Sequence, residues 1–272
     1  MEDSKRTSAP LMHWTNDHPV ADAVTSVAEG RTPLLEEPEA FVLSRLQGAG
    51  VRMAKRCFEA GEAIYLCGDP DRYLYFLTEG VLKLYKPYGR HKEAIVTLLE
   101  KNSVFGEPAP QVRGAHRDSA EAVVACRVAA VDKAALEYHL RRDPRCALAL
   151  LIAYSQWVQR RERATARLIP REIRPRLVAL LLELSNRFGE PTEGEVLIGV
   201  HLTHRMLAEM TASSRVGVSH EMARFCREGL IGIRRKGQIV LLDEPRMAEI
   251  IRSPLFRKHY SLECVEEEFS EV

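Results

Sequence analysis

No segment of the sequence is long and apolar enough to cross a membrane. A spanning helix needs about 20 consecutive apolar residues, whereas the longest apolar run covers only residues 147–153. The first residues, MEDSKR, lack the apolar core of a signal peptide. We therefore expect a cytoplasmic protein without a membrane partner.

Paired cysteines are also absent. None of the six cysteines forms a C-x-x-C pair, and structural zinc or iron–sulfur sites need such clusters. Reduced thiols in a cytosolic protein are the simplest interpretation, so we expect no metal and no cofactor. The cysteines are Cys57, Cys67, Cys126, Cys146, Cys226 and Cys264.

Common catalytic motifs are missing as well. The sequence has no nucleophile elbow, no P-loop and no H-E-x-x-H motif. Glu107 and His116 are too loosely spaced to support general acid–base catalysis, so the sequence does not indicate an enzyme. Because 39 Lys and Arg against 38 Asp and Glu give a net charge of +1, a nucleic-acid role requires a local basic face.

The chain does have enough apolar residues to fold. Its hydrophobic fraction is 46% over 272 residues, with only 16 Gly and 14 Pro, which excludes disordered and collagen-like proteins. This length suits one large or two ordinary domains. Residues 1–37 are polar and rich in Pro, Ser and Thr, and we expect them to form a flexible leader.

A short amphipathic helix around residues 41–46 precedes a series of β-branched and aromatic runs separated by turn signals. Many short runs of this kind predict an antiparallel sandwich or barrel over residues 38–142 rather than an α/β sheet. The expected strands are residues 63–67, 73–77, 81–85, 94–98 and 123–131.

A long helix is expected over residues 143–169. Asp143 can cap it and Pro144 suits its first turn, and no further Gly or Pro occurs before Leu168. One stripe at three- and four-residue spacing is typical of a spine shared by two copies; a helix packed only on its own domain is the alternative. The stripe consists of Leu148, Leu151, Ser155, Val158, Glu162, Thr165 and Leu168.

Residues 202–231 carry the most specific pattern. Thr203 is expected to cap one short helix and Ser213 a second, with a turn between them. The outer face of the second helix is short and polar, as in a recognition helix of the major groove. An unrelated all-α bundle is the alternative, but it does not explain this polar face. The predicted buried positions are Leu207, Met210, Val218, Met222 and Phe225.

A basic hairpin follows, with Arg234, Arg235 and Lys236 at its tip. Such a hairpin is expected to act as a wing on the DNA backbone. We expect a winged helix-turn-helix domain over residues 170–245. A C-terminal extension over residues 246–272 starts helical and ends acidic.

The order of these elements resembles the CRP/FNR superfamily of bacterial transcription regulators, and its nitrogen-control (NtcA) branch most of all. The resemblance covers residues 40–245. It implies an α+β fold with a cyclic-nucleotide-binding-like antiparallel β-roll, a long dimerisation helix and a winged helix-turn-helix. The matching segments are residues 73–84 (YLYFLTEGVLKL), 94–99 (AIVTLL), 102–107 (NSVFGE), 171–182 (REIRPRLVALLL), 202–204 (LTH) and 214–216 (SRV).

The resemblance also assigns DNA-binding roles. Arg215 matches the arginine that reads guanine through O6 and N7. Val216 stands where the cAMP receptor has Glu, and its apolar side chain suits a thymine methyl group, so half-sites containing GT with a downstream A are expected. Ser219 and His220 lie on the same face. The positions that match phosphate contacts are Thr203, Arg205 and Ser214.

The sensor positions differ from those of cAMP-binding relatives, in which a Gly-Glu pair holds the ribose, an Arg-Ser pair the phosphate and a Thr-Ser pair the adenine. Asp118 replaces the serine, and a carboxylate repels a phosphate, so we expect an effector other than cAMP. The corresponding residues here are Gly106 and Glu107, Arg117 and Asp118, and Arg161 and Glu162.

Other sensor chemistries stay open. Arg117 and a helix arginine are candidates to bind a small dianion such as 2-oxoglutarate; alternatively, the arginines near the end of the long helix are solvated, salt-bridged or close to DNA. A haem with His91, His116 or Cys67 as axial ligand is a further alternative, and so is the absence of any ligand. The arginines are Arg160, Arg161, Arg163, Arg167, Arg171, Arg174 and Arg176.

Taken together, these patterns predict a homodimeric, sequence-specific transcription regulator that reads a near-palindromic site on double-stranded DNA and works with RNA polymerase. The alternative is a dimeric effector sensor or interaction module with weak or vestigial DNA binding.

Overall fold

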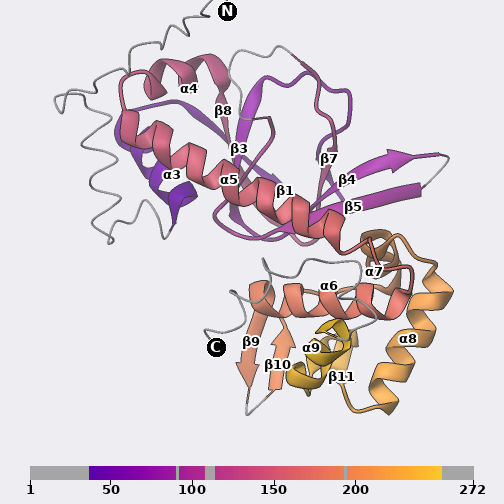
Figure 1. Ribbon diagram of the computed structural model, residues 1–272. Helices are drawn as coiled ribbons and strands as arrows, with labels where there is room; N and C mark the ends of the chain where they lie inside the picture. Colours follow the sequence, from indigo (N-terminus) through magenta and orange to yellow (C-terminus); the bar gives the residue numbers. More distant parts are fainter. Residues whose placement is uncertain (1–36, 90–91, 108–113, 193–194, 253–272) are drawn as a thin grey trace, which may run out of the picture.

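The computed structural model describes residues 37–89, 92–107, 114–192 and 195–252. These residues form a β-roll, a long helix beside it and a C-terminal domain of helices and a small sheet (Figure 1), which is the α+β architecture expected. The predicted leader up to residue 36, His91 and the acidic C-terminal end lie outside the described residues. None of the described helices is both long and apolar enough to span a bilayer.

Two four-stranded antiparallel sheets make up the β-roll. The first has the order β1-β8-β3-β6 and the second the order β2-β7-β4-β5. The core between them includes Leu77, Leu84, Phe105 and Val128. The strands are β1 (Met53–Phe58), β2 (Ala63–Tyr65), β3 (Tyr73–Glu79), β4 (Leu82–Tyr88), β5 (Lys92–Leu99), β6 (Ser103–Phe105), β7 (Ser119–Ala122) and β8 (Cys126–Asp132).

The five strands predicted for the β-roll are all present, with shifted ends. The last begins at Cys126 rather than Val123, because Val123 and Val124 both donate their backbone N–H to the carbonyl of Val81. Strands β1, β6 and β7 were not predicted. In β1 the four central side chains are all exposed, so its sequence lacks the alternation that marks a half-buried strand.

Three helices cover the first sheet: α3 (Pro38–Gly48), α4 (Lys133–Leu140) and α5 (Pro144–Ala166). They share a core with it that includes Leu46, Leu74, Leu136 and Ala149. The predicted cap of the long helix is confirmed, since the Asp143 carboxylate accepts the N–H of Cys146 at 3.2 Å. Helix α5 has 23 residues and is therefore about 35 Å long.

The predicted stripe of α5 lies mostly on its outer side. Leu151 is 63% exposed, and Ser155 and Glu162 are exposed as well. The buried face is a different one, formed by Cys146, Ala149, Leu150 and Ala153. Leu168 lies beyond the end of the helix. An exposed leucine in the middle of a long helix leaves apolar surface free for a partner.

The C-terminal domain packs three helices and a four-stranded sheet around α6. Its core includes Leu177, Leu181, Leu207 and Phe225, and the sheet has the order β11-β12-β10-β9. The elements are α6 (Ile173–Phe188), β9 (Gly189–Thr192), β10 (Glu195–Ile198), α7 (His204–Thr211), α8 (Arg215–Arg227), β11 (Ile231–Ile233), the 3₁₀ turn η1 (Arg235–Gly237), β12 (Ile239–Leu241) and α9 (Glu244–Arg252).

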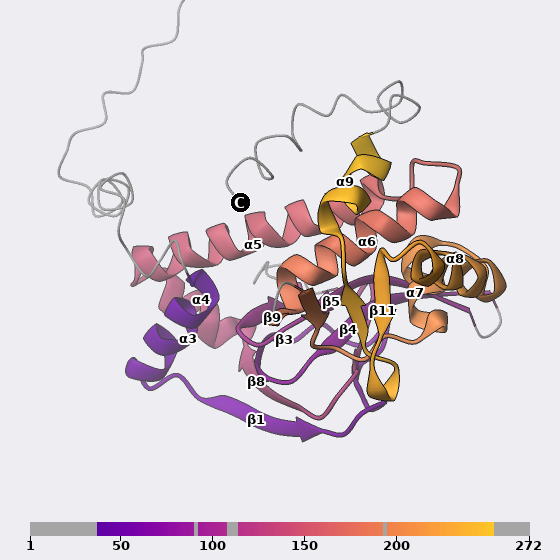
Figure 2. The ribbon, with the colours of Figure 1, turned by 90° about the horizontal axis from the view of Figure 1, so that it is seen from below.

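This core continues into the β-roll without a break. Tyr85, Ile95 and Leu98 of β4 and β5 are buried in the same cluster as the C-terminal core, and the two strands lie beside α6 and α7 in Figure 2. Arg187 on α6 donates to the carbonyl of Leu98 at 2.6 Å and to the Glu100 carboxylate at 2.9 Å. The helix-turn-helix is thereby held against the second sheet of the β-roll.

The buried imidazole of His116 predicts a pH dependence of stability. His116 is 3% exposed, and burial lowers its pKa from the usual 6.5 even though the nearby Asp71 opposes the shift. As pH falls through about 6.5, the unfolded chain takes up a proton that the folded chain does not, so the free energy of unfolding decreases.

Replacing His116 by Phe should flatten the dependence of the free energy of unfolding on pH between pH 7.5 and 5, measured by urea unfolding. A slope that is unchanged in H116F would contradict the expectation.

Candidate DNA-binding surface and sensor interior

The helix-turn-helix is built on two side-chain caps. The Thr203 hydroxyl accepts the N–H of Met206 at 3.1 Å at the start of α7, as predicted. At the start of α8 the cap is Ser214, which accepts the N–H of Gly217 at 3.0 Å. The prediction of Ser213 was wrong, because its hydroxyl donates back to the carbonyl of Thr211 in the turn.

The turn itself is tight because Ala212 adopts the left-handed conformation, with φ of 49°. This conformation ends α7 and allows α8 to start within three residues. The inward-facing positions predicted from spacing are confirmed as buried, namely Leu207, Met210, Val218, Met222 and Phe225.

The N-terminal part of α8 presents an open face to solvent. Arg215, Val216 and His220 are exposed, and Val216 has 66% of its surface accessible. An exposed valine between polar residues gains nothing for the fold, but it can contact an apolar group of a ligand. Arg215 and Val216 are thus exposed side by side at the start of α8.

Besides the caps Thr203 and Ser214, two more of the predicted contact residues are bonded within the protein. The Ser219 hydroxyl donates to the carbonyl of Arg215 at 2.9 Å and lies 2.9 Å from Nδ1 of His204. Arg205 donates to Glu209 at 2.7 Å along the exposed side of α7. His204 is not among the predicted site residues, because its contact with Ser219 joins two helices across the turn.

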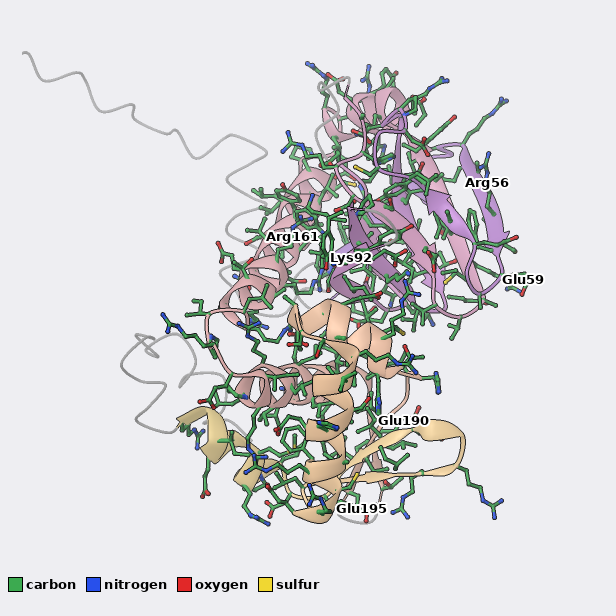
Figure 3. All side chains as sticks on the ribbon, turned by 90° about the vertical axis from the view of Figure 1, so that its right-hand side faces the viewer. Arg56, Glu59, Lys92, Arg161, Glu190 and Glu195 are labelled. Atoms are coloured by element: carbon green, nitrogen blue, oxygen red, sulfur yellow. The ribbon has the colours of Figure 1, made fainter. Side chains whose placement is uncertain are left out.

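The wing is present as a β-hairpin whose strands are β11 and β12. At its tip Arg235 is exposed, whereas Arg234 pairs with Glu195 at the start of β10. Glu195 lies at the end of the C-terminal domain that is farthest from the β-roll in Figure 3. The predicted basic hairpin is thus confirmed, with one of its charges balanced internally.

Most of the arginines around the end of the long helix form ion pairs or hydrogen bonds inside the molecule. Arg174 on α6 contacts Glu221 of α8 and Glu228, which follows the last residue of α8, and this ties α8 to α6. Arg176 donates to the carbonyl of Thr211 in the turn at 3.1 Å. The salt-bridged interpretation also fits Arg160 with Glu39 and Arg167 with Glu183.

The sensor interior differs from the expected pocket in one respect. The side chain of Arg117 is exposed, whereas Asp118 beside it is 6% exposed. Asp118 lies 3.2 Å from a guanidinium nitrogen of Arg161 on α5. The ionic contact between the β-roll and the long helix therefore comes from Asp118 and not from Arg117. Glu162 is exposed on α5.

Aromatic rings occupy the surroundings of this ion pair. His116 stacks on Tyr65 with 3.6 Å between ring centroids, and Tyr75 stacks on Phe105 at 5.2 Å. Gly106 lies close to this group, since a Cβ there would be 3.1 Å from the Tyr75 ring. Burial, and then the Asp118 carboxylate, raise the pKa of Tyr65 well above its usual value.

The predicted ligands of a haem do not converge in the described residues. His116 is buried in the ring stack and Cys67 is exposed, while His91 lies outside the described chain. Within the same residues, no three His, Cys, Asp or Glu side chains lie in a group suited to a metal ion.

Comparison with known proteins identifies both halves of the chain. Residues 55–143 match the cyclic nucleotide-binding domain, and residues 175–250 match the Crp-like helix-turn-helix domain. A global nitrogen regulator from Synechocystis sp. is 30% identical over 204 residues, which cover 74% of this chain and 90% of the relative. The transcriptional regulator LdrP from Thermus thermophilus is 32% identical over 193 residues, 68% of this chain and 91% of the relative.

Solved structures agree with this result. A transcriptional regulator of the CRP/FNR family, also from Thermus thermophilus, is 28% identical and has a TM-score of 0.61, covering 74% of this chain and 99% of that one. The fold and the two matched domains thus define a regulator with a nucleotide-binding-type sensor domain and a DNA-binding helix-turn-helix. The chain belongs to the CRP/FNR family of transcription regulators, and the resemblance seen in its sequence is confirmed.

The cap assignment leads to a testable difference between two adjacent serines. Ser214→Ala should lower the free energy of unfolding by about 1 kcal/mol, because the N–H of Gly217 loses its acceptor. Ser213→Ala is the matched control and should cost less, since Ser213 caps neither helix. Urea unfolding and amide hydrogen exchange at Gly217 measure both effects; an equal cost for the two variants would contradict the assignment.

Proposed function

We propose that this regulator is a homodimer that reads a near-palindromic DNA site through the N-terminal half of α8. The observation that carries the proposal is the exposed pair Arg215 and Val216, next to the Ser214 cap and opposite a fully buried face. In a symmetric dimer, two such helices enter successive major grooves about 34 Å apart.

The chemistry of this face supports a particular half-site. The Arg215 guanidinium can donate two parallel hydrogen bonds to O6 and N7 of guanine, and the methyl groups of Val216 suit the thymine methyl. We therefore propose half-sites with GT followed by a downstream A. We assign phosphate contacts to Thr203, Arg205, Ser214 and the wing. The contact between His204 and Ser219 joins α7 to α8.

The long helix supports the homodimer. The exposed Leu151 lies opposite the buried face of α5. A second copy, related by a two-fold axis that runs along the helix, can therefore cover Leu151. We propose that the dimer acts in the cytoplasm on chromosomal DNA together with RNA polymerase, and that it has no enzymatic activity.

Site selection from random duplexes, repeated at low and high salt, tests the proposal. A sensor or interaction module without DNA binding would select no sequence and would show no salt-dependent affinity. Enrichment of two GT-containing half-sites spaced by one helical turn would support the regulator; failure to select any duplex would contradict it.

Arg215→Ala should reduce affinity for the selected duplex by about 1–3 kcal/mol per half-site. Affinity for a scrambled duplex should fall much less, because only backbone contacts act there. Fluorescence anisotropy titrations measure both. Arg127→Ala is the control, since Arg127 is an exposed arginine of the β-roll that pairs with Glu79. If Arg215→Ala lost equal affinity for both duplexes, Arg215 would contact only the phosphate backbone.

Leu151→Asp should convert the dimer into a monomer, because two carboxylates would oppose each other at the dimer axis. Light scattering after size exclusion measures the mass. Tyr138→Asp is the matched control, since Tyr138 on α4 is 61% exposed and close to Leu151 in accessibility. A Leu151→Asp protein that remains dimeric would place the interface elsewhere.

A further inference from the structure

The carboxylate of Asp118 lies in the contact between the β-roll and α5. Asp118 is 6% exposed and accepts a hydrogen bond from Arg161 at 3.2 Å. Its second oxygen accepts the Tyr65 hydroxyl at 3.3 Å. The carboxylate therefore has one partner on the sheet and one on the long helix, and it joins the two elements.

Arg161 is held from a second side by an aromatic ring. Its guanidinium carbon lies 4.5 Å from the centre of the Trp157 ring, and Trp157 stacks on Tyr154 one turn earlier at 5.3 Å. The carboxylate neutralises the charge of the guanidinium, and the carboxylate and the indole face together hold it in position. Arg161 projects from α5 where the helix passes the β-roll (Figure 3).

Aromatic side chains of the β-roll lie next to Asp118. Tyr65 lies between the carboxylate and the rings of His116 and Phe105, at centroid distances of 3.6 Å and 6.1 Å. A second buried ion pair, Lys133 with Asp71, lies behind His116. An anion that approached Arg161 would have to displace a carboxylate that is already bonded on both sides, and it would be repelled by it.

We infer that Asp118 is an internal counterion that takes the place of an anionic effector, so that the β-roll and α5 are joined without a small molecule. Cyclic nucleotides are anions, and this domain belongs to the cyclic nucleotide-binding class; here a carboxylate of the chain neutralises the arginine of the long helix. The inference rests on the proposed function, because α5 sets the separation of the two recognition helices, and it makes DNA binding independent of ligand.

Ligand independence is tested on wild-type protein that has been unfolded, dialysed and refolded to remove any bound molecule. It should bind the selected duplex as tightly as untreated protein, and millimolar cAMP or 2-oxoglutarate should change its Kd less than twofold. A protein that loses affinity on refolding and regains it with either compound would overturn the inference.

The ion pair is tested by single and paired substitutions. Asp118→Ala and Arg161→Ala should each weaken DNA binding by roughly tenfold or more, as expected for coupled sites. The exchange Asp118→Arg with Arg161→Asp, or the neutral pair Asp118→Asn with Arg161→Gln, should recover much of the loss. The control is Glu79→Ala, which breaks the exposed pair with Arg127. Losses that are additive in both double variants would overturn the inference.

A readout without DNA separates this inference from the proposed function. In a Trp14→Phe background, Trp157 is the remaining one of the two tryptophans. Asp118→Ala should shift its emission and increase its quenching by acrylamide, because the neighbouring guanidinium is released, while cAMP and 2-oxoglutarate should leave the wild-type emission unchanged. If neither the wild-type protein nor any variant binds DNA but the Trp157 emission responds in this way, the proposed function fails and the ion pair stands. An unchanged Trp157 emission in Asp118→Ala contradicts the ion pair.

Discussion

The placement of the recognition helix depends on the contact between Arg187 and the second sheet of the β-roll. One guanidinium binds the carbonyl of Leu98 and the carboxylate of Glu100, at the point where Tyr85, Ile95 and Leu98 enter the core of the C-terminal domain. That core also contains Phe225 of α8, so β5 and the helix-turn-helix are packed into the same cluster. The two domains share one hydrophobic core.

The elements that the sequence predicts well are those with strong local signals. Strands β3, β4 and β5, both helices of the helix-turn-helix and the basic wing follow from alternation, capping residues and turn residues in windows of about ten residues. The α4 helix was missed even though Asp132 caps it through the N–H of Ala134, because the preceding strand runs directly into it. Ser213 and Ser214 are equivalent as cap candidates in the sequence; the left-handed Ala212 decides between them.

The contacts that decide function join residues far apart in the chain. Asp118 and Arg161 are 43 positions apart, and only the packing of α5 against the β-roll brings them together. The repulsion of a phosphate by Asp118 could be expected from charge alone, but its pairing with Arg161 could not. Arg117 is exposed and Asp118 is buried, although both lie in the bend that precedes β7, so no strand alternation in the sequence assigns them to opposite sides.

The glutamates that face the DNA-binding surface have a consequence for the search along the genome. The carboxylates of Glu209 and Glu195 pair with Arg205 and Arg234, as phosphate oxygens of DNA would. DNA of any sequence has to displace these carboxylates from each arginine. The affinity for non-specific DNA is therefore lower than the number of basic side chains suggests. In the proposed complex, discrimination between sites therefore depends more on contacts to base edges than on these two arginines.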